Sequence, residues 1–244
     1  FESSDANFKR YPFDALAGCG IALKVMLALA DSRGLDVQEF LDDLVEFAAL
    51  GTVADVAPMI DENRVIVSYG CKKLSDSKKP GIKELLRIAG VKEVTTTSIG
   101  FQIGPRINAI GRLADSGTAL SLLLAEDDFI AKSLANTLNN ANTKRQKQQE
   151  ENIAQAVAYV EKNFDLEKEH ILILGADDWH PGLIGLIAGK IAEVYNKPTL
   201  VCSYKTDGYA KGSCRSTRNF NILNALKSEK AWALFKKRAD GSTV

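Results

Sequence analysis

The sequence predicts an α/β protein in which a mostly helical first part is joined by one long helix to a smaller α/β part. Apolar residues recur at helical spacing through much of the first half of the chain. No Gly or Pro interrupts residues 127–164, which favours one long helix there, although a break within it stays open. Two short apolar runs, at residues 170–174 and 199–203, flank a further helical pattern. That order favours a parallel β-α-β unit.

The first part begins with two predicted amphipathic helices. Residues 14–33 open as a loop and become a helical pattern near Gly18 and Gly20. Residues 37–50 carry one apolar stripe with acidic residues opposite, and they end at Gly51, a residue type typical of helix C-caps.

The pattern is weaker between these helices and the long one. Residues 63–69 suit a helix or a short strand, residues 83–89 a short helix, and residues 94–97 a strand. Residues 99–117 are rich in glycine with little periodicity, so a loop is predicted there, and helical structure resumes within residues 119–124.

The long helix is polar in its middle. Apolar positions recur near both of its ends, but residues 142–152 are polar on every face. This pattern is typical of a helix that bridges two domains through solvent. An ordinary surface helix with a weak apolar stripe is the alternative.

The bulk composition excludes several classes of protein. Lys plus Arg and Asp plus Glu are balanced at 31 each, and the four Cys are scattered without a C-x-x-C pair. No window is apolar enough for a membrane span, and reduced thiols in the cytosol are expected. Residues 210–244 are nevertheless basic, which predicts either an anion-binding face or a solvated basic helix. Both ends are interpreted as cuts, because the chain starts at Phe1 without an initiating Met and stops just after a basic run.

Two constellations in the first part could carry chemistry. Asp55 lies in a run of small and apolar residues after a helix end, so it is expected to cap a turn, pair with a base or bind a metal. Arg106, Asn108 and Arg112 are spaced among three glycines, and Arg offers a bidentate fork to phosphate oxygens. The alternative is an ion pair between one of these Arg residues and Asp115.

Two further constellations lie in the second part. His180 comes just before a predicted helix N-terminus, where backbone donors favour anions, although a capping or surface role is the alternative. The run from Lys211 to Ser216 places small residues around Arg215 at a strand-to-loop transition, which suits a phosphate nest or a simple turn with Arg215 in solvent. No catalytic triad, P-loop or dinucleotide fingerprint is present.

Taken in order, these motifs resemble the RecJ exonucleases of the DHH phosphoesterase family over essentially the whole chain. YPFDALAGCGIALKV is similar to the stretch after the DHH motif, GTVADVAP to the fourth motif, and GFQIGPRINAIGRL to the loop that closes the catalytic domain. WHPGLIGLIAGKIAE and KGSCRS are similar to the two motifs of the DHH-associated domain, with Cys214 where the family has Gly.

The resemblance implies the C-terminal part of a DHH catalytic domain at residues 1–126, a connecting helix at 127–164, and a truncated DHH-associated nucleic-acid-binding domain at 165–244. It also implies a 5′-to-3′ exonuclease that hydrolyses phosphodiester bonds of single-stranded DNA in recombination and repair. Two divalent ions, Mn²⁺ or Mg²⁺, would serve the reaction.

The resemblance assigns roles to individual residues. Asp55 maps onto a metal ligand, and Arg106, Asn108 and Arg112 map onto the catalytic loop near the phosphate. The residues that map onto the substrate-binding face of the second domain are His180, Gly212, Ser213, Arg215 and Ser216. The family's DHH triplet and other acidic motifs are absent, so this piece alone is expected to be inactive.

The expected partners are single-stranded DNA, a single-strand-binding protein and a RecQ-type helicase, in the cytoplasm and without a membrane. Two alternatives stay open. One is a DHH phosphodiesterase acting on oligoribonucleotides or cyclic dinucleotides, against which the long helix speaks. The other is an inactive relative that serves as a DNA-binding scaffold, against which Asp55 and Arg106 speak mildly.

Overall fold

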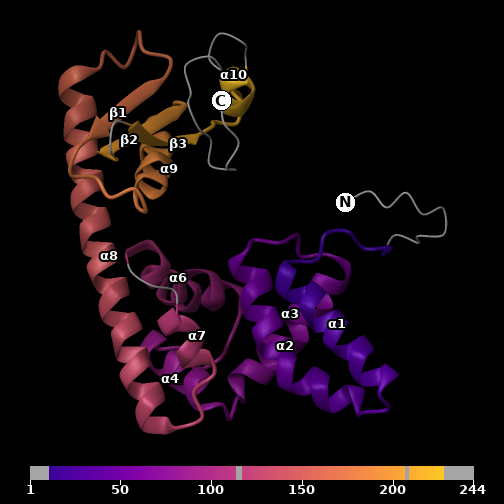
Figure 1. The fold of residues 1–244 in the computed structure, drawn as a ribbon. Helices are drawn as coiled ribbons and strands as arrows, with labels where there is room; N and C mark the ends of the chain where they lie inside the picture. Colours follow the sequence, from indigo (N-terminus) through magenta and orange to yellow (C-terminus); the bar gives the residue numbers. More distant parts are fainter. Residues whose placement is uncertain (1–10, 114–116, 207–208, 228–244) are drawn as a thin grey trace. The chain divides into compact units, whose positions relative to one another are not determined.

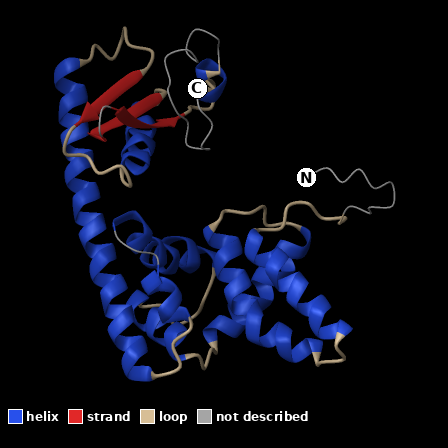
Figure 2. Cartoon of the chain, viewed as in Figure 1, coloured by secondary structure: helices blue, strands red, loops and turns tan. Residues whose placement is uncertain are grey.

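The computed structural model describes residues 11–113, 117–206 and 209–227 (Figure 1). The chain forms two compact units, residues 1–142 and residues 143–244. Within the described residues helices predominate, and the strands form one small sheet in the second unit (Figure 2). The α/β class expected from the sequence is therefore confirmed.

The first unit is helical throughout its described secondary structure. Its elements are α1 (Gly18–Ser32), α2 (Val37–Ala54), α3 (Asp61–Ser75), α4 (Pro80–Ala89), α5 (Thr96–Ser98), η1 (Ile99–Ile103), α6 (Gly104–Leu113), α7 (Gly117–Leu123) and the first part of α8 (Asp128–Asn163). Asp36 begins α2 as its N-cap, because its carboxylate accepts the backbone N–H groups of Gln38 and Glu39. The segment at residues 63–69, compatible with a helix or a strand, is part of helix α3.

Helix α2 is longer than the sequence pattern predicted. Gly51 was expected as its C-cap, but the helix continues through that residue to Ala54. A Cβ atom at residue 51 would lie 2.7 Å from Cys19 Sγ of α1, so a side chain there would clash. The glycine therefore serves the close approach of α1 to α2, and the expectation of a helix end was wrong.

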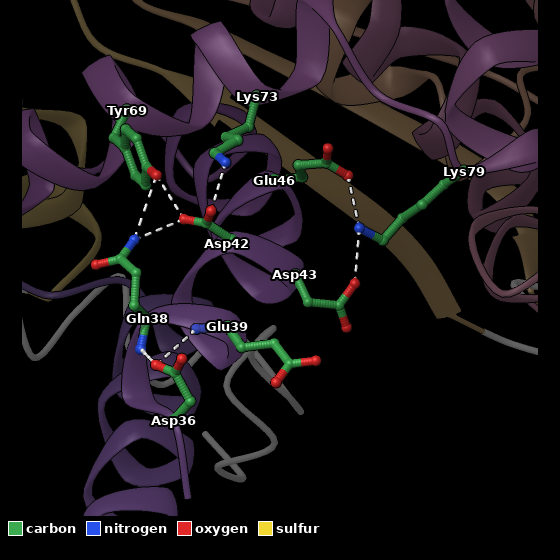
Figure 3. A network of polar contacts seen from close by, with 9 residues as sticks. All are labelled: Asp36, Gln38, Glu39, Asp42, Asp43, Glu46, Tyr69, Lys73 and Lys79. Carbon is green, nitrogen blue, oxygen red and sulfur yellow. Dashed lines mark hydrogen bonds and ion pairs between the residues drawn. The ribbon is translucent and has the colours of Figure 1, made fainter.

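A polar network fastens α2 to α3 and to the loop that follows it (Figure 3). Asp42 accepts hydrogen bonds from Tyr69 and Lys73, and these two groups, Lys73 first, lower the pKa of Asp42 to about 2. Lys79 forms ion pairs with Asp43 at 2.9 Å and with the buried Glu46 at 3.1 Å. Ion pairs and hydrogen bonds of charged groups therefore add to the apolar packing between α2 and α3 on this side of the unit.

The glycine-rich stretch that was expected to be a loop is helical instead. After α5, residues 99–103 form the π-helical turn η1, and α6 follows without a gap. The β-prone residues 94–97 likewise form no strand, because Thr95 caps α5 and Thr96 is already helical. Helical periodicity was hard to recognise in this stretch. Ile99 and Ile103 are fully buried at a four-residue spacing, but the neighbouring glycines weaken the apolar pattern in the sequence.

One apolar core holds the later elements of the first unit together. Ala131, Ala135 and Leu138 of α8 are fully buried in the same cluster as Ile99 and Ile103. The first part of α8 is thereby fixed against η1 and α6, and this contact positions the side chains discussed below.

The second unit contains a three-stranded sheet covered by helices. Strand β1 (Leu172–Ala176) pairs in parallel with β2 (Thr199–Thr206), and β3 (Tyr209–Arg215) pairs antiparallel with β2. Helix α9 (Ile184–Tyr195) connects β1 to β2, which confirms the predicted β-α-β unit. The short helix α10 (Ile222–Leu226) follows, and most of the basic tail after it lies outside the described residues.

Helix α8 spans 36 residues, close to the range expected for one long helix. The ends of its polar run are not in solvent, since Asn142 is 2% exposed and Asn152 is 5% exposed. The expectation of a run that is solvated on every face was therefore wrong at both ends. Within the described residues, neither α8 nor any other helix is apolar over enough of its length to cross a membrane.

Candidate functional site

Asp55 is the C-cap residue of α2 and its side chain is exposed. Of the roles expected for Asp55, neither a base partner nor a side-chain hydrogen bond to a turn is found among the described residues. A negative charge at a helix C-terminus is unfavourable, because the terminal carbonyl groups carry partial negative charge. The position of Asp55 is therefore not explained by the stability of α2.

The turn after Asp55 adds a second unfavourable feature. Val56 has φ of 57°, in the left-handed region that β-branched residues avoid. Its N–H bonds to Val53 O and the N–H of Ala57 bonds to Thr52 O, which is the Schellman arrangement that normally has Gly in the position of Val56. Strained backbone next to an unfavourably placed carboxylate is typical of a functional loop.

We expect Val56→Gly to stabilise the first unit by roughly 1 kcal/mol, because Gly adopts this φ without strain. The midpoint of thermal unfolding should rise by about 2–4 °C, as followed by circular dichroism. Val65→Gly is the matched control, since Val65 is 68% exposed but lies within helix α3. There the same substitution should lower the midpoint, and a fall at both positions would contradict the interpretation of strain.

The predicted basic loop is helix α6, which carries Arg106, Asn108 and Arg112. Arg106 is half-buried and Asn108 is exposed, whereas the side chain of Arg112, and Asp115 with which an ion pair was considered, lie outside the described part. A Cβ atom at Gly104, the first residue of α6, would lie 3.9 Å from Ala54 Cβ. The start of α6 thus adjoins the end of α2, where Asp55 follows.

Arg106 is fixed by two hydrogen bonds. Its Nε–H donates to Asn139 Oδ1 of α8 at 3.1 Å, and its Nη1 donates to the backbone oxygen of Gln102 at 2.7 Å. Burial lowers the pKa of Arg106 from its ordinary value. The guanidinium is therefore partly removed from water and held in one orientation.

The described residues alone do not form a metal site. No group of three or more His, Cys, Asp and Glu side chains converges in the part of the chain that the structure describes. Asp55 offers a single carboxylate, whereas Mg²⁺ and Ca²⁺ sites take six or more oxygen ligands. The residues present therefore do not fit a complete metal centre.

In the second unit, His180 lies in the loop between β1 and α9. Its Nδ1 accepts the backbone N–H of Gly182 at 3.0 Å, so the neutral ring carries its proton on Nε2. The preceding Trp179 is 3% exposed; its indole N–H donates to Gln155, and its backbone oxygen accepts Ser203 Oγ–H at 2.6 Å. Two hydrogen bonds to the neighbouring residue thus hold His180 ahead of α9.

Ser213 and Arg215 of β3 lie against the first turn of α9. A Cβ atom at Gly185 would be 3.1 Å from Ser213 Oγ and 3.3 Å from Arg215 Nη2. A hydroxyl and a guanidinium therefore lie together beside the first turn of α9, whose N-cap residue Leu183 makes no side-chain hydrogen bond. Such donors suit a phosphate group.

The remaining predicted residues of this unit have different surroundings. Residues 211–215 form an extended strand, so neither a nest nor a turn forms there, although Arg215 is exposed as the second alternative expected. A Cβ atom at Gly212 would meet Leu200 Cδ1 at 3.1 Å, which makes this glycine a packing requirement of the sheet. Ser216 Oγ accepts the backbone N–H of Ile222 and stabilises the start of α10.

Sequence analysis missed the residues that hold the predicted ones. Asn139 fixes Arg106, whereas Gln155 and Ser203 fix Trp179. The two amides lie in α8 just outside residues 142–152, the run that was expected to face solvent. The only sequence feature that could have indicated the two amides is their position beside the apolar stripe of α8.

Comparison with known proteins places this geometry in a family. No family model matches the chain. The chain is 37% identical to the single-stranded-DNA-specific exonuclease RecJ of Bacillus subtilis, over 88% of this chain and 27% of that protein. It is 34% identical to the exonuclease of the same name from Escherichia coli, over 91% of this chain and 40% of that protein.

Two solved structures have a similar fold. RecJ from Thermus thermophilus in complex with Mg²⁺ matches with a TM-score of 0.79 and 29% identity, over 94% of this chain and 34% of that one. A manganese-bound exonuclease RecJ matches with a TM-score of 0.72 and 30% identity, over 89% of this chain and 52% of that one. The chain spans 27% of the Bacillus subtilis relative and 40% of the Escherichia coli relative. Over the segment that it spans, this chain belongs to the RecJ family.

Proposed function

We propose that this chain is part of a 5′-to-3′ exonuclease that hydrolyses phosphodiester bonds of single-stranded DNA in recombination and repair. The observation that carries the proposal is the position of Arg215 and Ser213 against the first turn of α9, in a chain of the RecJ family. These groups supply positive charge and hydrogen-bond donors without reading base edges. Recognition of a strand through its phosphates matches an exonuclease that acts along any sequence.

In this proposal the second unit holds the strand. The Arg215 guanidinium binds a phosphate, and Ser213 Oγ–H donates to the same group from the same face of β3. His180 carries a donor proton on Nε2, since its Nδ1 is occupied by Gly182. Gly212 and Ser216 contribute through the shape of β3 and the start of α10.

In the same proposal, the first unit contributes the catalytic residues. Arg106, Asn108 and Arg112 share one short helix, and Arg106 presents a fixed positive charge to the phosphate. Asp55 would be one ligand of two Mn²⁺ or Mg²⁺ ions. In the full-length protein, such ions would supply the activation of a water molecule and the stabilisation of the leaving oxygen. Because Asp55 is a single ligand, the segment alone is expected to be inactive.

The proposal extends to domains, partners and location. Residues 1–126 belong to the DHH catalytic domain, residues 127–164 connect it, and residues 165–244 belong to the DHH-associated domain. A single-strand-binding protein and a RecQ-type helicase are proposed as protein partners in the cytoplasm.

A nuclease assay on the full-length protein tests the proposal. Single strands labelled at either end, a blunt duplex and a dinucleotide would be incubated with Mn²⁺ or Mg²⁺. Release of mononucleotides from the 5′ end of single strands only is the expected result. Preference for the dinucleotide would indicate an oligonucleotide phosphodiesterase, and binding without cleavage under both ions would indicate a scaffold protein.

We expect Gly185→Ala to weaken binding of single strands about fivefold, since its Cβ atom forces Ser213 and Arg215 to shift and costs on the order of 1 kcal/mol of hydrogen bonding. Fluorescence anisotropy of a labelled strand on the full-length protein measures this. Gly189→Ala is the matched control, because a Cβ atom there lies 3.7 Å from Arg215 Nε, an ordinary contact. Gly189 lies in the interior of α9 and Gly185 in its first turn, so the control gains at least as much helix propensity, and equal binding by the two variants would contradict the proposed site.

A further inference from the structure

Arg106 is held in place by acceptors that carry no charge. Among the described residues, its two hydrogen-bond partners are the side-chain amide oxygen of Asn139 and the backbone oxygen of Gln102. Buried or half-buried arginines are usually paired with a carboxylate, which cancels their charge. Neither partner of Arg106 does so.

The charge of Arg106 is also not cancelled elsewhere in the described part of the chain, where none of the ion pairs includes it. A guanidinium has five N–H donors, and the two described bonds use two of them. Within the described residues, the remaining donors and the positive charge are therefore left for an anion. Partial removal from water strengthens that attraction, because screening is weaker than in bulk solvent.

The position of Asn139 is set by a fully buried part of the first unit's core. It follows Leu138, which is fully buried with Ala135 in the core that also contains Ile103. The amide therefore projects from a helix that cannot move without disturbing this core. Arg106 lies three residues after Ile103, so both partners of the hydrogen bond are anchored in the same cluster.

We propose that Asn139 is a positioning residue for Arg106: it fixes the guanidinium for a phosphate of the substrate strand and, as a neutral acceptor, leaves its charge uncompensated. This inference rests on the proposed function, in which Arg106 contacts a phosphate. A carboxylate in place of the amide would hold Arg106 as firmly but would neutralise it.

The test uses that difference in the full-length protein. Asn139→Asp keeps the size and the contact and adds a negative charge, whereas Asn139→Leu removes the contact. Asn140→Asp and Asn140→Leu are matched controls, because Asn140 is the exposed neighbour on the same helix. The readouts are KM and kcat for single strands, the inhibition constant of inorganic phosphate, and the midpoint of thermal unfolding.

Asn139→Asp is expected to raise KM and the phosphate inhibition constant roughly tenfold while the unfolding midpoint stays unchanged, as for loss of one charge-assisted hydrogen bond. Asn139→Leu should raise both constants as well, and the Asn140 variants should change them less than about twofold. A structural role alone predicts that Asn139→Asp resembles the wild type, and that result would overturn the inference.

A parallel Arg106→Ala variant separates this inference from the proposed function. If Arg106→Ala raises KM and the phosphate inhibition constant but Asn139→Asp does not, only the role of Asn139 is wrong. If Arg106→Ala changes neither constant, the phosphate contact of Arg106 is wrong and the role of Asn139 falls with it.

Discussion

Asp55→Asn in the full-length protein is expected to lower the turnover of single-stranded DNA by on the order of 10²–10³-fold, while strand binding stays within about twofold. The reason is that Asp55 contributes to the transition state and not to holding the strand, which the proposal assigns to the second unit. Single-turnover cleavage and anisotropy titrations measure the two properties separately.

The same substitution should make the protein slightly more stable. Removing a negative charge from the C-terminus of α2 relieves an unfavourable interaction worth roughly 0.3–1 kcal/mol. Asp76→Asn is the matched control, because Asp76 is the exposed C-cap residue of α3. It should leave turnover unchanged and give a smaller gain in stability, because Lys72 and Lys73 lie in the last turn of α3. If Asp55→Asn keeps wild-type turnover, the assignment of Asp55 is wrong.

Arg215→Ala is expected to weaken binding of a single strand by roughly 10–100-fold, which is the range for a charge-assisted hydrogen bond. Losing one phosphate contact should also reduce the salt dependence of binding, with the slope of log K against log salt becoming less negative by about 0.7. Anisotropy titrations at several salt concentrations measure both effects.

Arg218→Ala is the control for charge alone. Arg218 is exposed three residues further along the chain, after strand β3 has ended. It should change affinity less than about twofold. If both variants lose the same affinity and the same slope, then general positive charge holds the strand and the site beside Gly185 has no special role.

Periodicity was sufficient where one face of an element is buried. It predicted α2, α8 and the β1–α9–β2 unit, because apolar residues recur at the spacing of each element. It failed for η1 and α6, since glycine was interpreted as a loop signal when it marks a close approach. A Cβ atom at Gly104 would lie 2.9 Å from Ile99 O, and no local pattern reveals a contact of that kind.

The candidate site was predictable only in part for the same reason. Arg106 and Arg215 were identified from their residue type and their small neighbours. What each side chain contacts depends on elements distant in sequence: Asn139 lies 33 residues after Arg106, and Gly185 belongs to another element than Arg215. Single-sequence reasoning has no access to such pairs. Identifying these residue pairs required the three-dimensional structure.

Successive residues of β3 point to opposite faces of the sheet, so its odd-numbered and even-numbered positions meet different requirements. Odd positions, such as Ser213 and Arg215, turn toward α9, whereas even positions, such as Gly212 and Cys214, turn to the face shared with Leu200 and Cys202. The substitutions that successive positions of this strand tolerate should therefore alternate. Even positions are limited to small residues by packing, as at Gly212, while odd positions are constrained by what they must hold.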